Sequence, residues 1–138
     1  MKETIVWNVE QGLALGSIDI ARAERTRTEL VERVSAFFDR FDFLVMPVTQ
    51  VLPFDIEVEY PTEIEGVAMD TYLDWMQACW CITVTGSPAI SVPCGFTEQG
   101  MPVGLQIVGR RGDDLGVLRL AHAFEQATRV GERRPPAA

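Results

Sequence analysis

The sequence has very few of the residues that enzymes most often use for proton transfer and nucleophilic attack. Its 138 residues include one lysine, Lys2, and one histidine, His122. No two of its four serines lie together in a glycine-rich loop; these are Ser17, Ser35, Ser87 and Ser91. His122 also has no adjacent pair of acid and nucleophile in the sequence. A hydrolase triad of Ser87, His122 and Asp74 is therefore a weak hypothesis.

The sequence also lacks the features of several broad classes of protein. No apolar run approaches the roughly 20 residues that a membrane helix needs, and Met1 to Thr4 leads into no apolar signal segment. The formal net charge of -8 disfavours binding to the phosphates of nucleic acids, although a local basic patch could still meet RNA. We therefore expect a cytoplasmic protein that has no membrane partner.

The cysteines are too few and too isolated to indicate a metal site. A zinc site needs about four ligands, whereas Cys79, Cys81 and Cys94 lie far from the single histidine. An odd number of cysteines in apolar surroundings is typical of buried thiols in a reducing compartment. We expect neither a metal nor a cofactor.

The composition that remains, 47% hydrophobic and 23% charged residues, is typical of one globular domain. Helical spacing of apolar residues predicts a long helix from a cap at Ser17 to about Arg40. A second helix is predicted after a cap at Asp70, and because it has apolar residues on nearly every side, we expect it to be enclosed. A third is predicted from Leu115 to about Arg129, with Gly131 as its end.

Three segments have the pattern of strands. Phe41–Pro47 is a continuous apolar run, which predicts a strand buried on both faces in a parallel or mixed sheet. Ala89–Phe96 and Met101–Val108 predict an antiparallel hairpin that turns at Glu98–Gly100, where Gly100 can take a positive φ. Gly104 inside a strand indicates that another group packs closely against that face.

The interleaved helices and strands predict an α/β fold of about three strands and three helices. Between them, Val48–Met69 has no clear pattern, and loops of that length are often functional or pack on a partner. A sheet of three strands has exposed edges. These features indicate that the chain is part of a larger body.

One long stretch resembles a known family. The sequence TGSPAISVPCGFTEQGMPVGLQIVGRRGDD, residues 85–114, followed by LAHAFEQA, resembles the C-terminal portion of amidase signature enzymes. That family includes the A subunit of glutamyl-tRNA(Gln) amidotransferase. Upstream, VEQGLALGSIDIARAERTR and FDFLVMPVTQ are similar to the segments that precede this hairpin in the family. The resemblance implies that residues 1–131 are the C-terminal part of a mixed-sheet amidase signature domain, and we expect residues 132–138 to be a flexible tail.

The resemblance also implies a reaction. Amidase signature enzymes hydrolyse carboxamides, or glutamine in the case of the amidotransferases, through an acyl-enzyme formed by a Ser–cis-Ser–Lys triad. The triad lies in the N-terminal half of the family's fold, and none of its members transfers to a residue of this chain. We therefore expect the chain alone to be inactive. A non-catalytic folding or interaction module remains the alternative.

The family places walls of its substrate pocket in the segment before the hairpin. The resemblance implies four substrate-binding residues: Asp74, Trp75, Thr83 and Thr85. Asp74 would receive a substrate amine, or else be an ordinary carboxylate on the helix surface, and the threonines could equally be loop hydroxyls. Glutamine-specific members place an asparagine where this chain has Thr83 or Thr85, so a general amidase and an amidotransferase both stay open. The partners implied are a second copy or the missing N-terminal half, a small amide substrate, and amidotransferase subunits.

Overall fold

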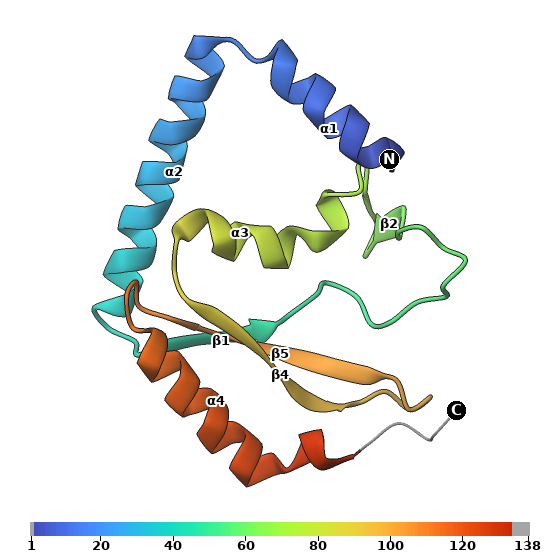
Figure 1. The fold of residues 1–138 in the computed structure, drawn as a ribbon, viewed down its shortest axis with the longest axis vertical. Coiled ribbons are helices and arrows are strands. Elements are labelled where there is room, and N and C mark those ends of the chain that lie inside the picture. Colours follow the sequence, from blue (N-terminus) through green and yellow to red (C-terminus); the bar gives the residue numbers. More distant parts are fainter. Residues whose placement is uncertain (1, 134–138) are drawn as a thin grey trace.

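A three-stranded antiparallel sheet lies at the centre of the computed structural model, which describes residues 2–133 (Figure 1). The strand order is β1-β5-β4, so that β5 pairs with both neighbours. The α/β class and the hairpin over residues 89–108 are confirmed. The main elements in chain order are α1 (Glu3–Ala14), α2 (Ser17–Phe38), β1 (Phe43–Pro47), α3 (Gln77–Thr85), β4 (Ala89–Phe96), β5 (Pro102–Gly109) and α4 (Asp114–Thr128).

The two faces of the sheet are covered by different helices (Figure 1). The buried Gln106 of β5 donates from Nε2 to the carbonyl of Ala78 in α3 at 3.4 Å. The next residue, Ile107, packs instead against Val117 and Ala121 of α4. Because side chains alternate along a strand, α3 and α4 lie on opposite faces. The face toward α4 is the apolar core, and the face toward α3 carries the polar Gln106 beside the buried Val108.

The sheet also departs from the sequence-based predictions at its edge. The strand in Phe41–Pro47 was predicted to be buried on both faces, but β1 is an edge strand that pairs antiparallel with β5, and its Val45 is 49% exposed. Continuous apolar character did not distinguish an edge strand from an enclosed one. The close approach predicted at Gly104 is confirmed, because a Cβ there would lie 3.0 Å from both Ser91 Oγ and Val48 Cγ2.

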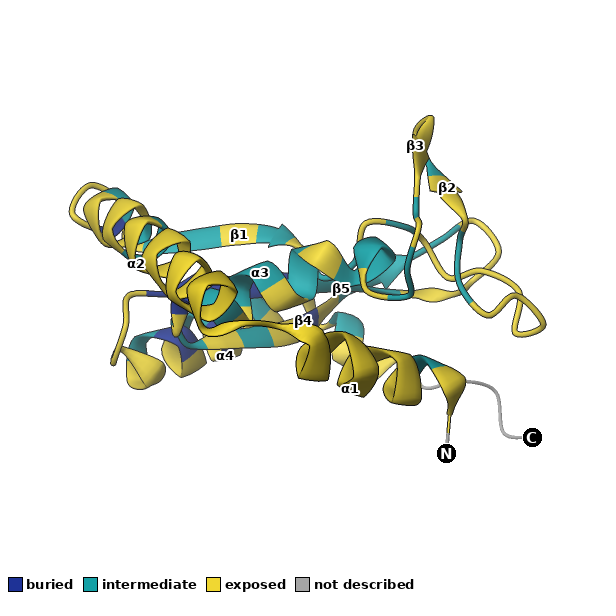
Figure 2. Cartoon of the chain, turned by 90° about the horizontal axis from the view of Figure 1, so that it is seen from above, coloured by how far each residue is buried: buried dark blue, intermediate teal, exposed yellow. Residues whose placement is uncertain are grey.

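Helices α1 and α2 extend away from the sheet, and Figure 2 shows them mostly exposed. Within the described residues, α1 buries no side chain and α2 buries only Phe38. Sequence patterns missed α1, since neither Lys2 before it nor Leu15 after it is a capping residue. In α2, Ser17 is the first helical residue rather than the cap: Asp19 Oδ2 accepts a hydrogen bond from the Gly16 N–H at 3.1 Å.

The second predicted helix starts later than expected. Residues 74–76 form a short 3-10 helix, η1 (Asp74–Met76), which leads into α3. The cap predicted at Asp70 is wrong, because Asp74 closes the turn by accepting from the N–H and the hydroxyl of Thr71, at 2.7 and 3.0 Å. The prediction that this helix is enclosed on nearly every side was also too strong, since Trp80 of α3 is 39% exposed.

The remaining segments add three short elements. The loop predicted without structure contains a two-stranded ribbon of β2 (Glu63–Ile64) and β3 (Val67–Ala68). The left-handed residue that ends α4 is Arg129, with φ 55°, and not Gly131, which lies in the 3-10 helix η2 (Val130–Glu132). Residues 134–138 of the expected tail lie outside the described residues, and the domain boundary stays a prediction.

Two further features concern the sequence-based expectations about compartment. The three cysteines are free, and each is half-buried rather than fully buried. Among residues 2–133, no helix has the length and apolar character needed to cross a membrane.

Candidate functional site

A row of four aromatic rings crosses the segment where the substrate pocket was predicted. Tyr60 contacts Tyr72, Tyr72 contacts Trp75, and Trp75 contacts Phe54. The ring centroids are 5.8, 5.9 and 5.5 Å apart, and each pair is nearly perpendicular. Edge-to-face pairs at such distances are favourable beyond the area that they bury. The row therefore ties the long loop after β1 to the start of α3 and forms a preformed wall.

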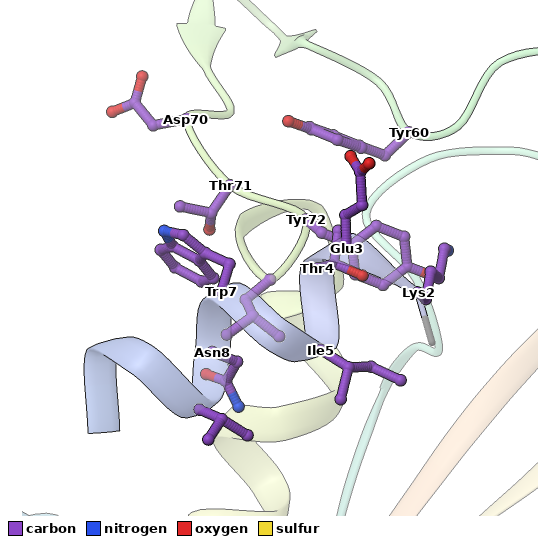
Figure 3. A pocket seen from close by; sticks show the side chains of 12 residues that line it. Lys2, Glu3, Thr4, Ile5, Trp7, Asn8, Tyr60, Asp70, Thr71 and Tyr72 are labelled. Atoms are coloured by element: carbon purple, nitrogen blue, oxygen red, sulfur yellow. The ribbon is translucent and has the colours of Figure 1, made fainter. Parts of the chain in front are cut away.

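A hollow lies on each side of this aromatic wall. Tyr60 and Tyr72 line the first, the α1 pocket, which has a volume of about 740 Å³ and is also lined by residues of α1 (Figure 3). Phe54 and Trp75 line the second, the proline pocket, of about 470 Å³, beside the ends of β1 and β5. Three prolines belong to its lining: Pro47, Pro53 and Pro102.

Trp75 has an unused hydrogen-bond donor. In the described part of the chain, its indole Nε1 is buried and has no acceptor. Buried donors without a partner are rare in folded proteins, and each costs about 1–3 kcal/mol. Trp75 thus combines a place in the wall of the proline pocket with a buried N–H that has no partner among the described residues.

Asp74 is occupied by local structure. One oxygen of its carboxylate holds Thr71, and its backbone carbonyl accepts from Gln50 Nε2 at 3.2 Å. The Oε1 of the same Gln50 accepts from the Ala78 N–H at 3.1 Å, which fixes the first turn of α3 to the loop. Asp74 lines neither the α1 pocket nor the proline pocket. Its geometry is that of a residue that positions the aromatic wall.

Thr83 and Thr85 lie at the end of α3 and differ in what they can reach. Thr83 lines a third hollow of about 380 Å³, the Thr83 pocket, together with Ser87 and Gln106. Thr85 is 6% exposed. Its hydroxyl donates to the Ile82 carbonyl at 2.6 Å and accepts from the Ser87 N–H at 3.2 Å. Thr85 therefore closes the turn before β4 and has little capacity left for a ligand.

The structure does not bring the four predicted residues into one pocket. Trp75 and Thr83 line different hollows, and Asp74 and Thr85 hold turns. The triad of Ser87, His122 and Asp74 is not assembled either, since Asp74 is bound to Thr71 and His122 is exposed on α4. Sequence patterns missed the α1 pocket because its walls come from an unpredicted helix and from an irregular loop.

Lys2, the single lysine of the sequence, lies at the α1 pocket. Its Nζ is 4.4 Å from the ring centroid of Tyr72 and 3.7 Å from Glu59 Oε1, and its side chain is 53% exposed. No serine lines that pocket. A lysine that works as a base needs to be desolvated and close to its nucleophile, and Lys2 meets neither condition.

Comparisons with known proteins agree with this fold. Residues 3–118 match the family described as Amidase. The chain is 37% identical over 117 residues to the A subunit of glutamyl-tRNA(Gln) amidotransferase from Brevibacillus brevis, and 34% identical over 114 residues to the protein of that name from Thermodesulfovibrio yellowstonii. Each alignment covers 83% of this chain and 22% of the relative. The chain thus spans about a fifth of the length of these curated relatives.

Solved structures of the same family have a similar fold. A bacterial aryl acylamidase of the amidase signature family superposes with a TM-score of 0.80 at 26% identity, over 98% of this chain and 29% of that one. A 6-aminohexanoate cyclic dimer hydrolase complexed with substrate superposes with a TM-score of 0.77 at 26% identity, over 99% of this chain and 30% of that one. The resemblance to part of an amidase signature enzyme is confirmed. The chain belongs to the amidase family.

Proposed function

We propose that this chain works as part of an amidase that hydrolyses carboxamides. The match of residues 3–118 to the amidase family carries this proposal. The reaction would follow the family's route: a serine attacks the amide carbonyl, a second serine relays the proton to the leaving amine, and a lysine is the base. Water then releases the carboxylic acid from the acyl-enzyme.

The catalytic residues of this reaction are proposed to lie outside the chain. The state of Lys2 supports this, because its half-exposed ammonium is paired with Glu59 and rests on Tyr72. Ser87, the serine that lines a hollow, has no lysine or histidine in that lining. The chain would therefore supply sheet strands, packing helices and part of the substrate pocket, and a further part of the enzyme would supply the triad.

The large accessible surface supports the same proposal. The chain exposes 10429 Å², whereas a compact monomer of 15.4 kDa exposes about 7,200 Å². The difference, about 3,200 Å² on one chain, is at or above the roughly 1,000–2,500 Å² that each partner buries in most obligate interfaces. This surface includes exposed apolar side chains of α1 and the start of α2, such as Ile5, Leu13 and Ile18. We propose that it packs against the N-terminal half of an amidase signature domain or, where that half is absent, against a second copy.

The pocket residues can be assigned roles within this proposal. Trp75 would contact the substrate through its ring in the proline pocket, or Thr83 would contact it in the Thr83 pocket, because the two residues line different hollows. Asp74 and Thr85 would position these walls through their turns. The relatives include A subunits of glutamyl-tRNA(Gln) amidotransferase. Glutamine and the further subunits of such a complex are therefore the proposed substrate and partners if the enzyme is an amidotransferase.

The test has two stages. The isolated chain is first assayed for ammonia release from glutamine and from small carboxamides, and no turnover above buffer is expected. Turnover that is lost in Ser87→Ala or His122→Ala would overturn the proposal. The coding sequence upstream of Met1 is then read, and any longer protein that it encodes is assayed in the same way. An in-frame glycine- and serine-rich stretch with an upstream lysine, together with activity, supports the amidase.

A non-catalytic interaction module is the second candidate. The same apolar surface favours it, because a chain with this much exposed apolar area needs a partner of some kind. The absence of a catalytic segment upstream, combined with stable self-association of the chain, would favour the module over the amidase.

A further inference from the structure

The side chain of Gln50, in the loop after β1, lies at the junction between η1 and α3. We propose that Gln50 is a positioning residue: its amide is inserted into the hydrogen-bond ladder at the start of α3 and thereby fixes the place of the Trp75 ring. Its effect on substrate binding rests on the proposed function, in which that ring can contact the substrate in the proline pocket. The place of the ring can be measured without catalysis, so the two proposals can fail separately.

The amide of Gln50 takes the place of one helical hydrogen bond. In a continuous α-helix, the N–H of Ala78 would donate to the carbonyl of Asp74, four residues earlier. Here the Ala78 N–H donates to Gln50 Oε1 at 3.1 Å, and Gln50 Nε2 donates to the Asp74 carbonyl at 3.2 Å. The two backbone groups are therefore joined through the amide instead of directly.

The helix is interrupted at the point of insertion. Met76, between η1 and α3, has φ -102° and ψ 16°, whereas α-helical residues have about -63° and -42°. Before this residue the chain is a 3-10 helix, and the Asp74 carbonyl also accepts from the Gln77 N–H, only three residues further on. A side chain that inserts into the ladder is one of the causes of such interruptions.

The interruption decides where Trp75 points. A 3-10 helix turns by about 120° per residue and an α-helix by about 100°, and their rises are about 2.0 and 1.5 Å. Over the three residues of η1, the difference adds up to about 60° and 1.5 Å. The Trp75 ring lies 5.5 Å from that of Phe54 and 5.9 Å from that of Tyr72, centroid to centroid. If η1 joined α3 as regular α-helix, at least one of these contacts would be lost.

The segment that carries Gln50 is itself fixed to the sheet. The N–H of Val48 donates to the Gly104 carbonyl of β5 at 3.4 Å, and a Cβ at residue 104 would lie 3.0 Å from Val48 Cγ2. The glycine thus allows the segment to lie against β5. The Val48 carbonyl also accepts from Cys79 Sγ of α3 at 3.0 Å. Gln50 therefore joins the start of α3 to a segment whose place is set by the sheet.

The experiment places 5-fluorotryptophan in the full chain and follows it by fluorine NMR. The chain has three tryptophans, Trp7, Trp75 and Trp80, and single replacements by phenylalanine assign their resonances. Gln50→Leu removes both hydrogen bonds and keeps a side chain of similar size. It is expected to move the Trp75 resonance toward that of the free amino acid, because the ring leaves an aromatic neighbour. The Trp7 resonance is expected to stay in place.

Gln77 provides a matched control. It is exposed at the first residue of α3, and its side chain forms no hydrogen bond within residues 2–133. Gln77→Leu makes the same chemical change beside the junction and is expected to leave all three resonances in place. If Gln50→Leu leaves the Trp75 resonance where the parent chain has it, or if both variants move it equally, the positioning role is wrong.

A second variant covers the case in which Gln50→Leu does not fold, which its helical circular dichroism would show. Gln50→Glu keeps an acceptor for the Ala78 N–H, but its carboxylate cannot donate to the Asp74 carbonyl. It is expected to move the Trp75 resonance toward that of the free amino acid while the helical signal stays that of the parent. A Trp75 resonance at the parent position in this variant would also overturn the role.

A longer protein with amidase activity tests the effect on the substrate. Gln50→Leu is expected to raise KM several-fold and to change kcat less, because the wall binds the substrate and the triad carries out the reaction. An unchanged KM would overturn the role of Gln50 at the substrate pocket. If no longer protein hydrolyses an amide, the amidase proposal fails, and a shifted Trp75 resonance in the isolated chain still supports the positioning role.

Discussion

Gly109 of β5 packs against Val117 of α4, and its replacement by alanine is a sharp test of that packing. A Cβ at this position would overlap the Cγ2 methyl of Val117, and it would lie 3.6 Å from the Asp113 carbonyl oxygen and 3.7 Å from Phe43 Cε1. Val117 is 3% exposed, and its branched side chain has few alternative rotamers. Neither side of the contact can therefore move without shifting the sheet or the helix.

The expected cost follows from this overlap. One extra carbon in a closely packed core destabilises a protein by about 1–3 kcal/mol, against a total stability of about 5–15 kcal/mol for an ordinary domain. We therefore expect Gly109→Ala to lower the free energy of unfolding by about 1–3 kcal/mol. Urea unfolding followed by circular dichroism measures this, and the denaturant slope should not change.

Two control variants separate the overlap with Val117 from other causes of destabilisation. Gly12 lies inside α1 with no atom within 4 Å of an added Cβ, so Gly12→Ala is expected to be neutral or to stabilise by up to about 1 kcal/mol. Combining Gly109→Ala with Val117→Ala removes the overlapping methyl, so the double variant should be more stable than the sum of the two single effects predicts, by about 0.5–3 kcal/mol. If Gly109→Ala leaves the urea midpoint where it was, or if the two changes simply add, the proposed contact between β5 and α4 is wrong.

Three further predictions concern the turns and the surface. Gly100→Val is expected to destabilise the chain by about 1 kcal/mol or more, because Gly100 has φ 83° and a β-branched residue resists that region; an unchanged urea midpoint would contradict this. Asp74→Ala is expected to destabilise the chain by about 1–2 kcal/mol, since the two hydrogen bonds from Thr71 are lost. Asp74→Asn keeps an acceptor oxygen and should cost less. Equal losses of stability in the two variants would exclude the role of Asp74 in closing the turn. The chain is expected to self-associate at micromolar concentration through the exposed apolar side chains of α1 and the start of α2. Light scattering that gives a monodisperse mass of 15.4 kDa, together with no binding of an apolar dye, would contradict this.

Much of the fold follows from local patterns in the sequence. The hairpin of β4 and β5 was predictable because alternation, strand-end prolines and a turn glycine all act between residues close together in the chain. Helices α2 and α4 were predictable from apolar periodicity. The lack of a second lysine and of clustered serines could also be read directly, and it sufficed to predict that the family's triad is not encoded in this chain.

The candidate site depended on contacts between distant residues. The aromatic wall forms only when Tyr60 of an irregular loop meets Tyr72, and the N-terminal end of α1 meets the same loop through Lys2 and Glu59. No periodicity encodes such contacts, because they join segments that share no hydrogen-bonding pattern. For the same reason the sequence left open whether Asp74 binds a ligand or is an ordinary carboxylate on the helix surface, and its partner Thr71 became apparent only once the turn was folded. Composition and spacing thus determined which residue types were available, and tertiary packing decided which of them face a pocket and which are used to hold one in shape.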